Sequence, residues 1–153
     1  MNYKTYTNID EAINDEQEMK KKYGFYIHCV VNDNNNKFIN MHTHGLLENF
    51  GLLDVQLSHI ENDLEHTRDL FYKLIEIYIN EKLVRLKDGD LISIGVDKYI
   101  AIRVIRDEFM ILNYRFIFPD PKGKYPWEEG CDRIYKSQWT KNDEKHSKRI
   151  INY

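Results

Sequence analysis

The sequence predicts a single α+β domain spanning residues 1–153, a two-layer sandwich in which an antiparallel-rich sheet of about five to six strands packs one face on one main helix. Three observations predict it. Hydrophobic residues are 42% of the chain and aromatic residues 13%, enough to bury a core. Segments with strand-like alternation lie in both halves of the chain. One long amphipathic helix separates them, and packing it on the sheet buries both apolar faces.

The first predicted element is a short N-terminal helix over Thr7–Gly24. Thr7 or Asn8 can cap its start, Lys20–Lys22 suit its negative C-terminal end, and Gly24 can stop it. Its apolar stripe is thin. We therefore expect this helix on the surface, along one edge of the sheet.

A β-hairpin is expected next. Phe25–Val31 and Phe38–His44 alternate like strands, and the Asn-rich segment Asp33–Lys37 between them is typical of a turn. We expect Gly45–Gly51 to be a loop, followed by a third strand over Leu52–Ile60.

The clearest helix covers Leu64–Leu83, where apolar residues recur at helical spacing. A turn at Lys87–Asp90 follows it. Three more strands are expected after that turn, at Leu91–Val96, Tyr99–Ile105 and Phe109–Phe118.

All three prolines fall within Pro119–Pro126, which ends the regular structure. The next segment, Trp127–Trp139, is expected to be an ordered loop. The polar tail from Thr140 is expected to fray.

Strand alternation assigns side chains to two faces of the sheet. One face is apolar, includes Cys29, and should pack on the Leu64–Leu83 helix. The opposite face could be an ordinary solvated face, but its residues bond directionally, which favours a binding site. They are Tyr26, His28, Asn40, His42, His44, Asp54, Gln56, Ser58, Arg103, Asn113 and Arg115.

The charge and the cysteine pattern argue against several classes of protein. A net charge of −3 makes nucleic acid an unfavoured partner, and no apolar run is long enough for a membrane span. Without a signal-like N-terminus, we expect a cytoplasmic protein with two free thiols, Cys29 and Cys131. The acidic residues around Cys131 should raise the pKa of its thiol.

Metal chemistry is one hypothesis. His42 and His44 point the same way on a strand, about 7 Å apart, and a third ligand could be His28, Asp54 or Gln56. A divalent metal is the one cofactor that this spacing suits. A metal-assisted hydrolase would then use His42, His44 and Asp54 as its catalytic residues.

The leading hypothesis is binding of a small polar or anionic ligand, such as a nucleotide-derived molecule, on the His42/His44 face under the Pro119–Trp139 loop. The arginines could bind its anionic group, or could instead pair with Asp54, Asp107 or Glu108. A protein-interaction module with a tyrosine-rich surface, or a homo-oligomer, is the other alternative. The candidate ligand-binding residues are Tyr26, His28, His42, His44, Asp54, Gln56, Arg103, Arg115, Asp120, Trp127 and Tyr135.

Four stretches together resemble one family: YGFYIHCV, INMHTHGL, LDVQL and RFIFPDPKGKYPWEEGCDRIYKSQW. The chain resembles the domain-of-unknown-function family 4262 over about Tyr23–Trp139. The resemblance implies a small bacterial or phage α+β domain and no particular reaction. The residues that match its motifs are His42, His44, Gly45, Asp54, Gln56, Pro119, Asp120, Pro121, Cys131, Asp132, Tyr135 and Gln138.

Overall fold

The computed structural model describes residues 8–31, 39–59, 64–106, 110–138 and 150–151. Within these ranges, seven strands form one mixed sheet in the order β1-β2-β3-β6-β5-β4-β7. The strands are β1 (Tyr26–Val31), β2 (Ile39–His44), β3 (Val55–His59), β4 (Leu91–Gly95), β5 (Lys98–Arg106), β6 (Leu112–Ile117) and β7 (Ile150–Ile151). The helices are α1 (Ile9–Tyr23), α2 (Leu46–Phe50), α3 (Leu64–Asn80) and α4 (Arg133–Lys136). The predicted α+β class is confirmed.

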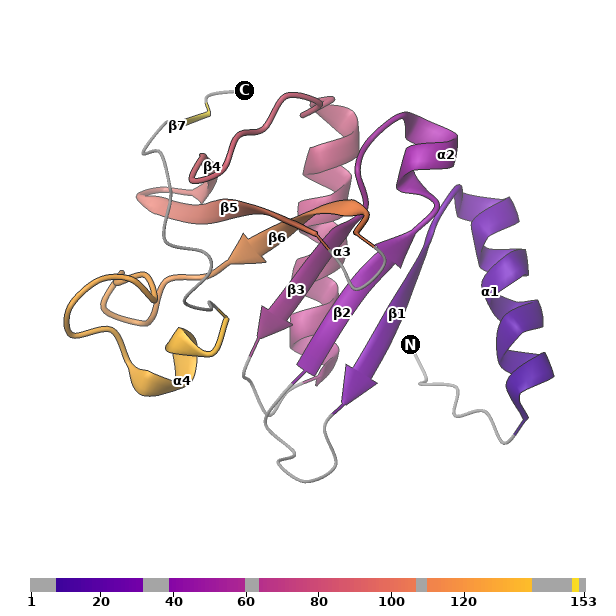
Figure 1. Ribbon diagram of the computed structural model, residues 1–153, viewed down its shortest axis with the longest axis horizontal. Helices are drawn as coiled ribbons and strands as arrows, with labels where there is room; N and C mark the ends of the chain where they lie inside the picture. The colour runs from indigo at the N-terminus through magenta and orange to yellow at the C-terminus, as the bar shows by residue number, and fades with distance from the viewer. Residues whose placement is uncertain (1–7, 32–38, 60–63, 107–109, 139–149, 152–153) are drawn as a thin grey trace.

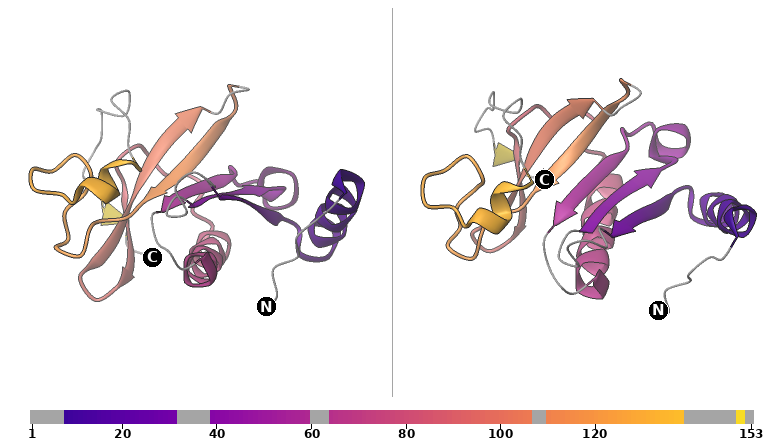
Figure 2. Two further views of the ribbon diagram at one scale, coloured as in Figure 1. Left: turned by 90° about the horizontal axis from the view of Figure 1, so that it is seen from below. Right: turned by 60° about the horizontal axis from the view of Figure 1, so that its bottom comes forward.

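The sheet is antiparallel except where β6 joins β3 and where β7 joins β4. The β3–β6 pair is parallel because the two strands are not consecutive in the chain. After β3, the chain passes through α3 to β4 near the far edge of the sheet, and β5 and β6 then lead back until β6 lies beside β3 (Figure 1). The β5–β6 hairpin turns out of the plane of β1–β3, away from α3 (Figure 2). The face opposite α3 therefore has a projecting wall on one side.

The core lies between α3 and the sheet. Phe71, Ile75 and Tyr78 follow the helical repeat and are at most 1% exposed, which gives α3 a continuous apolar face. They pack against strand residues such as Leu57 and Phe116, which are equally buried. These contacts fix which face of each strand is left for polar side chains.

The edge helix α1 agrees with its prediction. The side chain of Asn8 accepts a hydrogen bond from the backbone N–H of Asp10 (2.9 Å), and Gly24 ends the helix at a φ of 84°. No residue of α1 is buried. The helix lies beyond the edge strand β1 (Figure 1).

Some local predictions were wrong. Gly45–Gly51 is not a loop, because Leu46 inserts into the core and Leu46–Phe50 form a short helix. Trp127–Trp139 also contains the helical turn α4. The expectation of a frayed tail fails at Ile150–Ile151, which pair with β4. Cys29 is exposed rather than buried, because it lies on an edge strand with a neighbour on one side only.

Other predictions lie outside the described residues. They include the turn at residues 33–37, the acidic residues Asp107 and Glu108, and Trp139. The last predicted strand begins at Leu112 rather than at Phe109, which is also outside the described residues.

Candidate metal centre

Three histidines meet on the sheet face opposite α3. The register of the β1–β2 hairpin places His28 directly opposite His42, and Tyr26 opposite His44. Met41, which alternates with these histidines on β2, is 1% exposed in the core. His42 and His44 therefore point away from the core, as the alternation predicted, and His28 joins them from the neighbouring strand.

The three imidazoles lie close enough to share one ion. Ring centroids are 4.7 Å apart for His42 and His44, 4.9 Å for His28 and His42, and 6.3 Å for His28 and His44. One ring nitrogen from each histidine lies within 4.8 Å of the others. A tetrahedral zinc ion with bonds of about 2.0–2.1 Å needs nitrogens roughly 3.3 Å apart. Rotation of exposed or half-exposed side chains can close that difference.

The end of β2 is fixed where the backbone at Gly45 approaches the backbone at Gly24. Gly45 has a φ of 104°, and a Cβ added there would lie 2.8 Å from the carbonyl oxygen of Gly24. The side chain of Asn49 donates a hydrogen bond to the same carbonyl (2.7 Å), and Lys20 forms an ion pair with Glu48. These contacts join α1 to α2 and fix the position of His44 at the corner.

Asp54 was a candidate third metal ligand, but its carboxylate already accepts hydrogen bonds from other residues of the protein. Its Oδ1 accepts hydrogen bonds from the Thr43 hydroxyl (2.9 Å) and from the backbone N–H of Leu46 (3.1 Å). Thr43 is 2% exposed, and its hydroxyl oxygen also accepts the N–H of Val55 (2.9 Å). Among the described residues, the group that could share an ion consists of His28, His42 and His44 and does not include Asp54.

The surroundings favour neutral imidazoles. Burial, followed by the charges that His44 and His28 would carry, lowers the pKa of His42 from 6.5 to about 4. Burial also lowers the pKa of His44, although Asp54 opposes this shift. Only a neutral imidazole has a lone pair for a metal ion. At neutral pH, protons therefore compete little with a metal for these two side chains.

Lowering the pH from 6.5 towards 4 should destabilise the metal-free protein through His42. The unfolded chain protonates this imidazole near pH 6.5, whereas the folded protein keeps it neutral down to about pH 4. The unfolded state thus binds more protons in this window, so the stabilisation present above pH 6.5 is lost as the pH falls. After allowance for partial solvent exposure, we expect a loss of about 1 to 2 kcal/mol.

Urea unfolding of chelator-treated protein near neutral pH and at roughly pH 4.5 measures this loss. The matched variant is His42→Gln, which keeps a polar side chain that does not titrate. On the same change of pH, the His42→Gln protein should lose about 1 to 2 kcal/mol less free energy of unfolding than the wild type. Equal losses in the two proteins would show that His42 is not the group responsible.

The polar face continues from the histidines across β3 and β6. The register places His42 beside Gln56, Gln56 beside Arg115, and Arg115 beside Arg103. Arg115 donates from Nε to Oε1 of Gln56 (3.4 Å) and from Nη1 to the carbonyl oxygen of Gln138 (3.3 Å). Its guanidinium is thus held between the Gln56 side chain on β3 and the backbone of Gln138.

Arg103 has a different environment from Arg115. Its side chain is 3% exposed and forms an ion pair with Asp88 at 3.1 Å. Asp88 also accepts the backbone N–H of Val104 (2.9 Å). One pairing partner of Arg103 is therefore on the turn before β4. Because its side chain is buried, Arg103 contributes to the structure of the domain rather than to a surface that binds a ligand.

The segment expected to cover the histidines lies elsewhere. Residues 119–138 lie beside β5 and β6, on the far side of β3 from the histidine strands (Figures 1 and 2). Within this segment, the ring of Trp127 stacks on Tyr125, whose hydroxyl donates to the carbonyl of Tyr99 (2.9 Å). Tyr135 is half-buried in α4. The described part of the segment therefore does not lie over the histidines, although Gln138 at its end contacts Arg115 on the same face.

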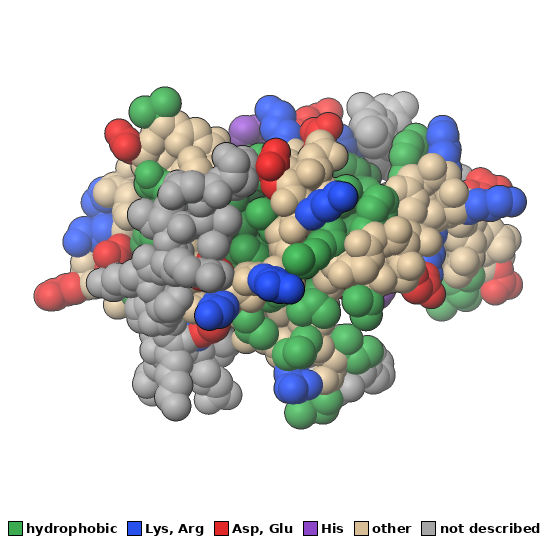
Figure 3. Space-filling model, turned by 90° about the horizontal axis from the view of Figure 1, so that it is seen from above, with side chains coloured by type: hydrophobic (Ala, Val, Ile, Leu, Met, Phe, Trp, Pro, Cys, Tyr) green, Lys and Arg blue, Asp and Glu red, His purple; other side chains and the backbone are tan. Residues whose placement is uncertain are grey.

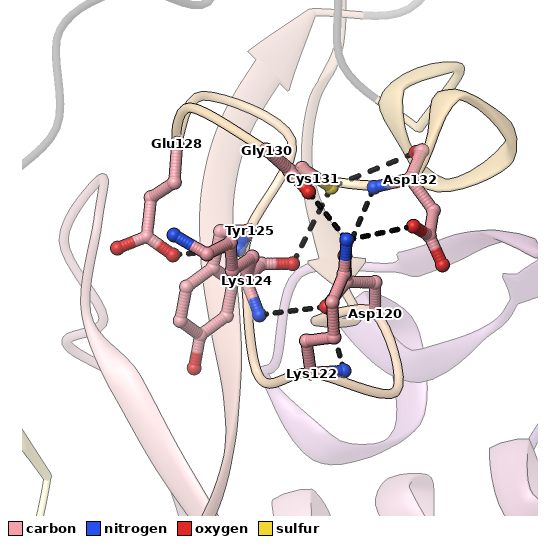
Figure 4. A network of polar contacts seen from close by, with 8 residues as sticks. All are labelled: Asp120, Lys122, Lys124, Tyr125, Glu128, Gly130, Cys131 and Asp132. Atoms are coloured by element: carbon pink, nitrogen blue, oxygen red, sulfur yellow. Dashed lines mark hydrogen bonds and ion pairs between the residues drawn. The ribbon is translucent and has the colours of Figure 1, made fainter.

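Asp120 organises that segment (Figure 4). Its carboxylate accepts the backbone N–H groups of Lys122, Lys124 and Asp132, each at 2.9 Å. Burial acts to raise the pKa of Asp120, but these hydrogen bonds outweigh it and lower the pKa. The pKa of the buried Cys131 thiol is raised, as predicted, with burial as the larger cause and Asp120 as the next.

Two pockets that share lining residues lie beside α3, and residues of α1 line the first of them. Their volumes are about 350 and 330 Å³, and both include Phe25 and Tyr72. Their linings are mainly apolar, and they contain none of the predicted site residues. They are thus separate from the histidine face.

Two buried polar residues that strand alternation did not identify support the residues of this face. Thr43 lies between the two histidines of HTH, and its buried side chain anchors the strand that carries them. Gln138 is 1% exposed and supports Arg115 through its backbone. Only the family resemblance included Gln138.

Comparison with known proteins adds no homologue. No protein-family model matches the chain, and no curated protein or solved structure matches it significantly. The resemblance noted in the sequence stays a prediction. Among the described residues, no helix is long and apolar enough to cross a membrane.

Proposed function

We propose that this protein binds one divalent transition-metal ion, with zinc as the best fit, through His28, His42 and His44. The observation that carries the proposal is the convergence of three imidazole nitrogens within 4.8 Å on one face. Imidazole ligands suit zinc, copper, nickel and cobalt, whereas magnesium and calcium prefer oxygen.

The position of the triad also supports an exchangeable site. His28 is exposed, and all three side chains project from the face opposite α3. Three protein ligands leave a tetrahedral ion one position for water or another ligand. That fourth position would face away from the sheet.

Zinc added to chelator-treated protein without a histidine tag should bind at about one ion per chain, as measured by calorimetry and elemental analysis. Free zinc at about 100 times its dissociation constant should stabilise the fold by about 2.7 kcal/mol. For a chain of this size, the melting temperature should rise by roughly 5 to 10 °C. Magnesium and calcium serve as controls and should produce no shift. No binding of zinc, nickel or cobalt would refute the proposal.

The hydrolase hypothesis depends on the same ion. It needs a metal-bound water and a base, and the only carboxylate among its proposed catalytic residues, Asp54, is engaged with Thr43 and Leu46. Metal binding without turnover is therefore the function that the geometry supports best. Zinc-dependent hydrolysis would favour the enzyme instead.

An interaction surface is the second alternative, and one feature favours it. Exposed hydrophobic side chains cluster at the projecting end of the β5–β6 hairpin, at the lower edge of Figure 3. They are Met110, Ile111 and Leu112, with exposed fractions of 67%, 55% and 37%. Exposed apolar patches often mark sites of protein contact.

A further inference from the structure

We propose that the metal ion held by the histidine triad binds a phosphate-type oxyanion, and that Arg115 binds the same anion from the β6 side. This inference rests on the metal-binding function proposed above. It identifies the ligand class for the fourth coordination position and names a residue outside the triad that selects it.

The register provides the first argument. Gln56 and Arg115 follow His42 in one row across the sheet, each on the next strand. Neighbouring strands are roughly 4.8 Å apart. An ion between β1 and β2 therefore lies about 7 Å from β3, over which Gln56 draws the guanidinium of Arg115.

The size of an oxyanion matches this gap. A metal–oxygen bond of about 2 Å, an oxygen–oxygen edge of about 2.5 Å and a hydrogen bond of about 2.8 Å together span about 7 Å. One phosphate can therefore contact the ion with one oxygen and the guanidinium with another. A single water molecule bound to the metal is too short to do so.

The charges on the face provide the second argument. Three neutral imidazoles leave the full double charge on a bound ion, so an anion is its natural fourth ligand. On the α1 side, Glu16 is close enough to the Tyr26 hydroxyl to raise its pKa, and Lys20 is paired with Glu48. On the β6 side, Arg115 brings a positive charge to the same row of side chains as His42.

Positioning provides the third argument. The hydrogen bonds to Gln56 and Gln138 fix the plane of the guanidinium. A guanidinium held in place loses little entropy when it binds phosphate. Arg103, its neighbour on β5, is instead buried against Asp88. Of the two arginines on this face, Arg115 is the one that is partly open to solvent.

The test is calorimetric titration of inorganic phosphate into protein loaded with one equivalent of zinc. Phosphate should bind the zinc-loaded protein and should bind the metal-free protein at least about tenfold more weakly. Arg115→Gln should lower phosphate affinity by about 10- to 100-fold. Arg115→Lys should give an intermediate value, because lysine keeps the charge but loses the fork.

Two controls keep the outcomes distinct. Zinc affinity should stay within about threefold of wild type in Arg115→Gln, which also reports that the variant is folded. Arg106→Gln removes an exposed arginine of the hairpin, bonded to the Met110 carbonyl, and should leave phosphate affinity unchanged. Acetate, a planar monoanion, should bind more weakly than phosphate.

Several results would overturn the inference. Zinc binding with no phosphate binding would refute it and leave the proposed metal function intact. Equal phosphate affinity in wild type and Arg115→Gln would show that Arg115 does not bind the anion. Equal phosphate affinity with and without zinc would show that the metal ion does not bind it. Equal affinity for acetate would refute the preference for a phosphate-type anion. Failure to bind zinc would refute both proposals together.

Discussion

Replacing His42 with alanine should lower zinc affinity by at least about 100-fold and remove the zinc-dependent rise in melting temperature. Loss of an outer-shell partner of a metal ligand already costs 10- to 100-fold, and loss of a direct ligand should cost more. His42 is central to the triad, with ring centroids 4.9 Å from His28 and 4.7 Å from His44. Without it, the two remaining rings are 6.3 Å apart.

The geometry also predicts an order among the variants. His28→Ala leaves His42 and His44 together and should weaken binding less than His42→Ala. His66→Ala is the matched control, because His66 is exposed on α3. It should bind zinc as the wild type does. Wild-type affinity in His42→Ala, or an equal loss in His66→Ala, would show that zinc binds elsewhere.

Replacing Gln138 with alanine should reduce the free energy of unfolding by about 2 to 4 kcal/mol. The amide of Gln138 is 1% exposed. It accepts the N–H of Phe118 at 2.8 Å and donates to the carbonyl of Phe118 at 2.9 Å, as a neighbouring strand would. Alanine leaves both backbone groups buried without these bonds and adds a cavity.

Urea unfolding measures the effect, and two comparisons assign its cause. Gln138→Met keeps the volume but not the hydrogen bonds, so it should remain destabilised by more than about 1 kcal/mol. Lys136→Ala changes an exposed residue of α4 and should stay within about 0.5 kcal/mol of wild type. A Gln138→Met protein as stable as wild type would show that the amide contributes only packing.

The predicted hairpin and its faces were confirmed because alternation is a local property. Apolar residues such as Met41 and Leu57 face α3, and His42, which follows Met41 on β2, faces away. Gly24 and Asn8 bound α1 for equally local reasons. His42 and His44 could therefore be assigned to one face from their spacing alone.

The wrong predictions share a physical cause. Leu46 forms part of a helix because the core accepts its side chain, and Cys29 is exposed because β1 has only one neighbouring strand. Ile150–Ile151 form a strand because β4 offers an open edge. These results depend on residues far away in the chain, which a local pattern does not contain.

The sequence by itself determined the α+β class, the outward direction of His42 and His44, and the polar composition of their face, because side-chain direction along a strand repeats every two residues. Only the tertiary structure decided which residues meet. The register brought His28 to His42, and the parallel β3–β6 pair brought Arg115 beside Gln56. The core and the Asp88 ion pair enclosed Arg103, and the Pro119–Gln138 segment packed beside β6. Strand pairing depends on the packing of the whole chain, so neither spacing nor composition specified it.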